Sequence, residues 1–267
     1  MAMAMDDSDT ISYGQNVAKM LDIYKNGTAP YSTAVDNLVK LTFSIRRIRV
    51  MQWIPESGRI EKFIDSHCPF LKHQTFLFFE FELIMKKPCE IFREMWTQSA
   101  KFIIEAAKTT NKKQVASLLS SKPFQNMSPE MCSRAALELL PFLVPGKGRG
   151  DKAARHLVDS RMESANLASC IEQETRGSPF ILYIGSTIHL ILEGKPFVRF
   201  NTTADAVIGL MASYYVFHFK YSNKVQNALL FLQSYVLGVK DEATDTCPSV
   251  HSFSALVDKM KTSSLCL

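Results

Sequence analysis

The sequence predicts an α+β protein that is mainly helical, with a three-stranded antiparallel meander and two closing helices in the C-terminal half. Three observations support this fold class. Amphipathic helical patterns recur before residue 145, short runs rich in β-branched and aromatic residues follow Ser178, and helical signals return after Thr202. The hydrophobic fraction of 46% and the charged fraction of 21% are ordinary for a chain that buries a core.

Composition and turn signals divide the chain into regions. The Asn26-Gly27 turn and Pro30 predict that ordered structure begins near Thr33, and the polar stretch "DEATDTCPSV" predicts a mobile end. The predicted regions are a poorly ordered N-terminus at 1–34, a helical region at 35–145, an α+β region with the meander at 146–239, and a mobile tail at 240–267.

The first half contains several helical patterns. "AVDNLVKLTFSIRRIRVMQWI" has features of both helix and strand, and we favour a helix, whereas "FLFFEFELIM" suits a core element of either type. After Pro88 one helical face is apolar and includes Phe92 and Trp96. Further helices are predicted over 113–120 and 129–140, the second with Ser128 as its N-cap.

The second half changes from helix to strand and back. A helix is predicted from Asp151 toward Gln173, followed by the strands "PFILYIG", "TIHLILEG" and "PFVRF". The connections between these strands are too short for a crossover, so the strands are predicted to pair antiparallel. Thr202 with Asp205 matches a capping box for a helix to about Phe217, and a last helix runs from about 222 to 238.

Much of the chain resembles a known family. The order "ELLPFLVP" and then "RGSPFILYIGSTIHLILEGKPFVRFNTTADAVIGLMASYYVFHFKYSNKVQNALLFLQSYVLG", with "EFELIM…IFREMW" upstream, is similar to the C-terminal region of sterile-alpha-motif-domain-containing-like proteins of vertebrates, mainly fish. The resemblance covers roughly residues 70–240 and implies the meander and closing helices, with no assigned chemistry. The sterile alpha motif itself is not evident, so its self-association is not implied.

The stretch "GKGRGDK" is a glycine-rich loop before an expected helix. It lacks the G-x-x-x-x-G-K-[ST] spacing of a phosphate-binding loop, and Asp151 stands where the third glycine of a dinucleotide motif belongs. We therefore interpret the loop as a positively charged hinge that attracts anions weakly.

Two modest basic segments are candidate nucleic-acid contacts. Between Lys40 and Lys62 there are six basic and two acidic residues, and between Pro145 and Arg155 there are four basic and one acidic. The alternative interpretation is a solvated basic face beside a core tryptophan, which we favour for "RRIRV". The candidate contacts are Arg46, Arg47, Arg49, Lys147, Arg149, Lys152 and Arg155.

The aromatic segment "YYVFHF" is the candidate partner surface, because it supplies more large side chains than one small core needs. Its candidate residues are Tyr214, Tyr215, Phe217 and Phe219.

No catalytic or metal-binding constellation is evident. His67, Cys68, His73 and Cys89 lack the paired spacing of zinc ligands. On one predicted helix, the side chains of His156, Asp159 and Ser160 project in parallel and cannot form a catalytic chain. We predict no catalytic residues, no metal and no cofactor.

These observations limit the function. The six cysteines are scattered, the N-terminus lacks the features of a signal peptide, and the apolar stretches are too short for a membrane span. We therefore expect an intracellular protein, cytoplasmic or nuclear, without a membrane span. The leading hypothesis is a non-catalytic module that binds an unknown protein partner. The alternatives are a nucleic-acid-binding protein and an enzyme whose catalytic residues lie far apart in the sequence.

Overall fold

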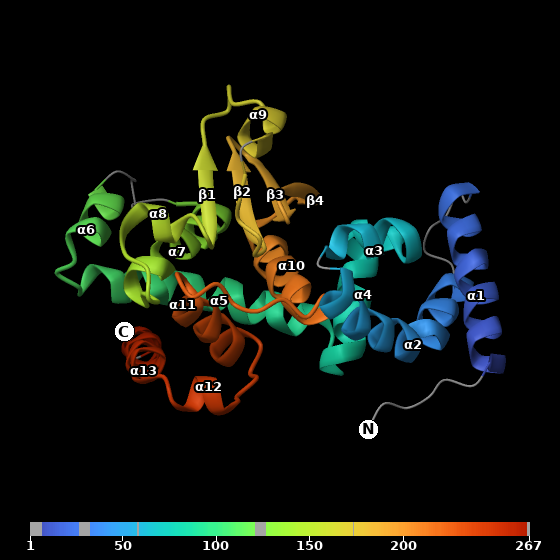
Figure 1. Ribbon diagram of the computed structural model, residues 1–267. Helices are drawn as coiled ribbons and strands as arrows, with labels where there is room; N and C mark the ends of the chain where they lie inside the picture. Colours follow the sequence, from blue (N-terminus) through green and yellow to red (C-terminus); the bar gives the residue numbers. More distant parts are fainter. Residues whose placement is uncertain (1–6, 27–32, 58, 121–126, 173, 266–267) are drawn as a thin grey trace. The chain divides into compact units, whose positions relative to one another are not determined.

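The computed structural model describes residues 7–26, 33–57, 59–120, 127–172 and 174–265 (Figure 1). The chain forms two compact units. The first comprises Met1–Lys87 with Tyr215–His218, and the second comprises Pro88–Tyr214 with Phe219–Leu267. The fold class is α+β and mainly helical, as the sequence predicts.

The first unit is helical in its described part. Both segments that are ambiguous in the sequence are helices, because each buries residues at helical spacing: Val35 and Val39 in one, Leu77 and Phe81 in the other. The elements are α1 (Asp7–Asn26), α2 (Thr33–Ser57), α3 (Ile60–His67), the short η1 (Pro69–Lys72) and α4 (Gln74–Met85).

Helix α1 occupies most of the segment that was expected to be poorly ordered. Tyr13 and Met20 lie seven residues apart on this helix, so they share one face, and both are buried where α1 packs against α2. In the rest of that predicted region, residues 33–34 begin α2, and residues 1–6 and 27–32 lie outside the described residues.

The second unit begins with a pair of packed helices. Its N-terminal elements are α5 (Cys89–Lys108), α6 (Lys113–Ser120), α7 (Pro129–Leu143) and α8 (Gly150–Ala154). Trp96 of α5 is fully buried and donates a hydrogen bond from Nε1 to Ser133 Oγ of α7 at 2.6 Å. The predicted cap of α7 is confirmed, since Ser128 Oγ accepts from the backbone N–H of Met131 at 3.2 Å.

The sheet has four strands in the order β1-β2-β3-β4 (Figure 1). The predicted antiparallel meander consists of β2 (Phe180–Ile184), β3 (Thr187–Leu192) and β4 (Lys195–Phe200). The fourth strand, β1 (Val158–Arg161), pairs parallel with β2, which corrects the prediction of three strands.

This extra strand also corrects the long helix expected from Asp151. The helical part stops at the end of α8, and the chain enters β1 because Val158 pairs with Ile181 and is buried beside it. A separate short helix, α9 (Leu167–Glu172), follows β1, and its apolar side chains pack on Phe180 and Leu182.

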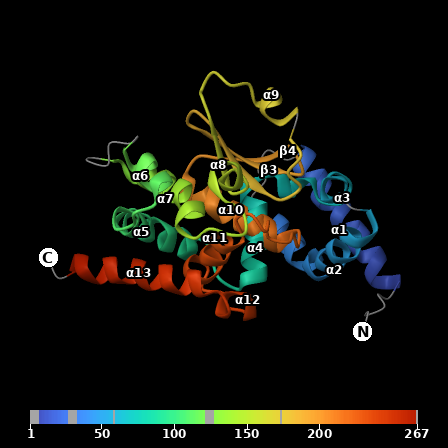
Figure 2. The same ribbon diagram turned by 60° about the vertical axis from the view of Figure 1, so that its left-hand side comes forward.

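Helices complete the second unit. They are α10 (Thr203–Val216), α11 (Gln226–Phe231), the π-helical η2 (Leu232–Val236), α12 (Glu242–Asp245) and α13 (Pro248–Leu265). The predicted capping contact of α10 is present, with the Asp205 amide donating to Thr202 Oγ1 at 3.1 Å. The expected mobile tail is helical in its described residues. Val250, Phe253 and Val257 are buried on one face of α13, which packs against α5 and α11 (Figure 2).

Candidate interaction surfaces and a polar pocket

The glycine loop is a close packing contact rather than a hinge. The backbone N–H of Lys147 donates to the carbonyl of Asn223 at 2.9 Å. A Cβ at Gly146 would lie 2.7 Å from that carbonyl oxygen, and a Cβ at Gly148 would lie 2.9 Å from the Cβ of Lys224. The glycines therefore allow the loop to approach the 223–224 backbone closely.

This packing gathers basic side chains on the second unit. Exposed Lys147 and Arg149 flank Gly148, which packs against exposed Lys224, and exposed Lys152 and Arg155 follow on α8 and directly after it. We call this set the basic surface: Lys147, Arg149, Lys152, Arg155 and Lys224.

His156 is half-buried and directly follows Arg155 of the basic surface. Burial lowers the pKa of His156, and the charges of Lys224 and Arg176 lower it further. These effects favour the neutral imidazole, so His156 does not add positive charge to the basic surface.

Arg46 does not belong to any surface. It is buried with Glu80 as an ion pair and also donates to the carbonyl of Val39 at 2.9 Å, while its Nε is buried without a hydrogen-bond partner among the described residues. A charge held in this way cannot reach nucleic acid, so the prediction of Arg46 as a contact is corrected. Its role is in the core of the first unit.

The other two arginines of "RRIRV" also make contacts within the first unit. Arg47 is half-buried and donates to the carbonyls of Tyr215, at 3.1 Å, and Val216. The guanidinium of Arg49 lies 4.3 Å from the ring centroid of Tyr13, a cation–π distance. The structure therefore does not bring these arginines together as a basic patch.

The predicted aromatic partner surface is largely internal. Tyr214 is buried and its hydroxyl donates to the carbonyl of Pro179 at 3.1 Å, and Phe217 is fully buried. Tyr215 and Phe219 are half-buried. Tyr214 and Phe217 are thus core residues, because the chain uses this segment to fill its interior.

Helix α2 carries an apolar stripe that sequence analysis did not identify. Leu41 and Met51 are 68% and 45% exposed, and Ile45 and Ile48 between them are half-buried. Their spacing of four, three and three residues places them on one helical face. We call these four residues the α2 stripe.

Asp159 and Ser160 lie on β1 and are both held by neighbours. Asp159 is buried and accepts hydrogen bonds from Arg161 at 3.0 Å and Arg176 at 3.1 Å. Ser160 donates to Glu138 at 2.8 Å. Arg155 Nε also lies 3.8 Å from Asp159 Oδ1, so three guanidinium groups engage this carboxylate, and it is not arranged to orient a catalytic histidine.

For a metal site, only the residues that the structure describes can be searched. In those ranges, no three metal-ligating side chains gather. Cys68 is fully buried, and burial raises the pKa of its thiol well above the usual value, which disfavours the thiolate that binds metals. Within the same described part, no helix is both long and apolar enough to cross a bilayer.

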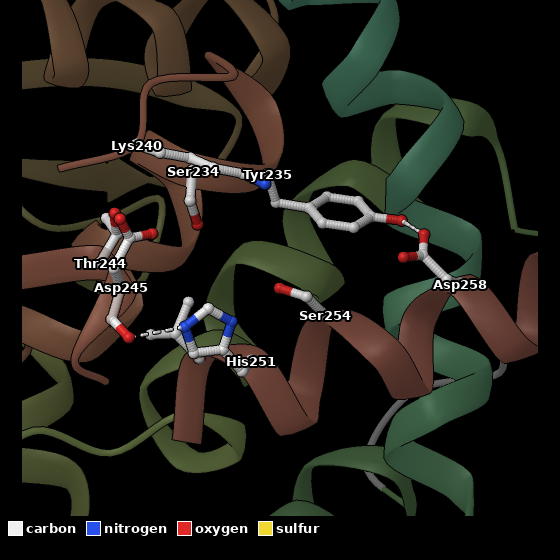
Figure 3. Close-up of a pocket in the computed structure, with 9 residues that line it drawn as sticks. Ser234, Tyr235, Lys240, Thr244, Asp245, His251, Ser254 and Asp258 are labelled. Atoms are coloured by element: carbon white, nitrogen blue, oxygen red, sulfur yellow. Dashed lines mark hydrogen bonds between the residues drawn. The ribbon is translucent and has the colours of Figure 1, made fainter. Parts of the chain in front are cut away.

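A polar cavity of about 270 Å³ lies between η2, α12 and α13 (Figure 3). Tyr235 donates from its hydroxyl to Asp258 Oδ1 at 2.5 Å, and His251 Nε2 lies 3.1 Å from the carbonyl of Asp245. Burial, together with the Asp258 carboxylate, raises the pKa of Tyr235. The sequence signal of this cavity was the density of polar residues after 238, which was interpreted as a mobile tail.

No family model, curated protein or solved structure matches the chain. The resemblance to sterile-alpha-motif-domain-containing-like proteins therefore stays a prediction.

Proposed function

We propose that the chain is a non-catalytic interaction protein and that its second unit binds nucleic acid through the basic surface. The observation that carries the proposal is the state of Lys147, Arg149 and Lys152. Their side chains are exposed, and within the described residues none of them has an ion-pair or hydrogen-bond partner. Such cations are available to neutralise phosphates and release the counterions of nucleic acid.

The basic surface fits the sugar–phosphate backbone better than it fits the bases. It consists of lysine and arginine on a loop and one helical turn, and the aromatic side chains that were expected to face a partner are buried or half-buried. Stacking on bases needs exposed aromatic rings. The proposed binding is therefore independent of sequence, since phosphate contacts carry no base information.

The test is a triple variant in which Lys147, Arg149 and Lys152 are replaced by glutamine. Its matched control replaces Lys101, Lys259 and Lys261 by glutamine. These three lysines are exposed on α5 and α13, so the control removes the same net charge as the test variant. Fluorescence anisotropy with labelled duplex DNA and single-stranded RNA is expected to show weaker binding for the first variant only. Equal loss in both variants, or tighter binding to polyglutamate than to either nucleic acid, would contradict the proposal.

A protein partner is the second candidate function, and the α2 stripe favours it. Monomeric proteins seldom leave a row of apolar side chains on one helix face without a use. The test is affinity purification of bound proteins with the unmodified chain, with Leu41→Glu and with a control variant, followed by comparison of the proteins that each chain recovers. Partners lost only from Leu41→Glu, and kept by the exposed α1 control Gln15→Glu, support the candidate. Equal recovery by all three chains would count against it.

A further inference from the structure

The polar cavity of the second unit is framed by an unusual helix. At η2 the amide of Leu237 donates to the carbonyl of Leu232 at 3.1 Å, five residues back, which is the π-helical pattern. Single π-helical turns are rare and often lie at functional sites. The chain then turns at Gly238, whose φ of +67° favours glycine, and passes along the cavity to α12.

A series of hydrogen bonds connects η2 to the start of α12 beside the cavity. Tyr221 donates from its hydroxyl to Gln233 Oε1 at 2.7 Å, and Gln233 Nε2 donates to Asp241 Oδ2 at 2.8 Å. Asp241 also accepts from the backbone N–H of Thr244 at 2.8 Å, which caps α12. The wall of the cavity between η2 and α12 is therefore fixed by contacts that do not use the side chains of Lys240, Asp245 and Ser254.

Several polar groups of the lining remain available. Within the described residues, Lys240, Asp245 and Ser254 have no side-chain hydrogen bond or ion pair. Because a carbonyl only accepts, His251 Nε2 donates in its bond to the carbonyl of Asp245. Figure 3 shows Asp258 and Asp245 on opposite sides of the cavity, with His251 and Ser254 between them.

From these groups we infer that the cavity binds a small zwitterion that carries an ammonium and a carboxylate, the class to which free amino acids belong. The ammonium pairs with Asp245 or with the free oxygen of Asp258, and the carboxylate pairs with Lys240 and accepts from Ser254.

Other ligand classes fit the charges less well. An anion would face two carboxylates, a simple cation would face Lys240, and a neutral polyol would leave both signs of charge without a partner. The size agrees with a small ligand, since 270 Å³ is below the range of about 300–1,000 Å³ for drug-sized ligands.

The test uses the full chain and NMR amide shifts with four probes of similar size. L-serine is the zwitterion, ethanolamine carries the ammonium alone, propionate carries the carboxylate alone, and glycerol is neutral. We expect L-serine to shift amides of residues 234–258 with a dissociation constant of about 1 mM or tighter. The other three probes are expected to bind at least about tenfold more weakly, as the loss of one charged hydrogen bond predicts.

Variants locate the binding. Lys240→Gln and Asp245→Asn are each expected to weaken L-serine binding by about tenfold or more. Lys259→Gln on α13 and Glu242→Gln on α12 are exposed controls outside the lining and are expected to leave it unchanged. The inference is overturned if L-serine causes no shifts, if a single-charge probe or glycerol binds as tightly, or if Lys240→Gln has no effect.

Discussion

Replacing Gly146 by alanine tests whether the glycine loop packs against the 223–224 backbone or acts as a hinge. The added Cβ would lie 2.7 Å from the carbonyl oxygen of Asn223 and 2.8 Å from that of Lys224. Both are backbone atoms, so neither can move away as a flexible side chain can. Overpacking of this kind costs about 1–3 kcal/mol. If the backbone moves apart to make room for the added methyl group, it also strains the hydrogen bond from the Lys147 amide to the carbonyl of Asn223.

The matched control is Gly177→Ala, which adds the same methyl group where no atom lies within 4 Å. There the change only reduces the freedom of the unfolded chain, which stabilises a protein by about 0.4–1 kcal/mol. The two variants are therefore expected to change the free energy of unfolding in opposite directions.

Urea unfolding followed by tryptophan fluorescence measures the difference. Trp96 is buried in the second unit, and the background substitution Trp53→Phe removes the signal of the first unit. If Gly146→Ala is no less stable than Gly177→Ala, the loop does not pack against Asn223 and Lys224, and the basic surface loses the contact that holds it together.

Three further predictions concern the interior. Glu80→Gln leaves the buried charge of its partner Arg46 uncompensated and is expected to destabilise the first unit by about 3–5 kcal/mol. Urea unfolding followed by Trp53, the part of the fluorescence that Trp53→Phe removes, measures this change, and a loss under about 1 kcal/mol would contradict it. Ser133→Ala removes the acceptor of the Trp96 indole and is expected to cost about 1–3 kcal/mol in the second unit, with unchanged stability as the contrary result. Burial, reinforced by Lys224, lowers the pKa of His156 below 6.5, so the unfolded chain takes up this proton first. The free energy of unfolding that His156 contributes above pH 6.5 is therefore lost as the pH falls through the pKa of His156 in the folded chain. His156→Gln is expected to flatten this dependence of the unfolding free energy on pH in urea titrations.

Short-range signals predicted the local structure well. The cap at Ser128 and the short turns of the meander depend on residues only a few positions apart, so their sequence patterns are sufficient. Strand β1 depends on the pairing of Val158 with Ile181, which lies far along the chain, and four residues are too few to show a period. The parallel pair was therefore not predictable from local pattern.

The candidate sites were predictable only in part. The basic residues of the loop were identified from composition, but Lys224 joins them through packing that no spacing reveals. The local pattern predicts Arg46 as a surface charge because its partner Glu80 is 34 residues away along the chain. The polar residues near Asp245 were interpreted as a tail, since nothing local shows that Phe253 is buried and fixes α13 against the core.

The salt dependence of DNA binding by the unmodified chain tests the central proposal most directly. If all five cations of the basic surface contact phosphates, the logarithm of the association constant is expected to fall with the logarithm of salt concentration with a slope of up to about −4.5, and the Lys147, Arg149 and Lys152 triple variant should reduce its size by about 2.7. No binding at about 50 mM salt, or an equal slope in the triple variant, would contradict the account.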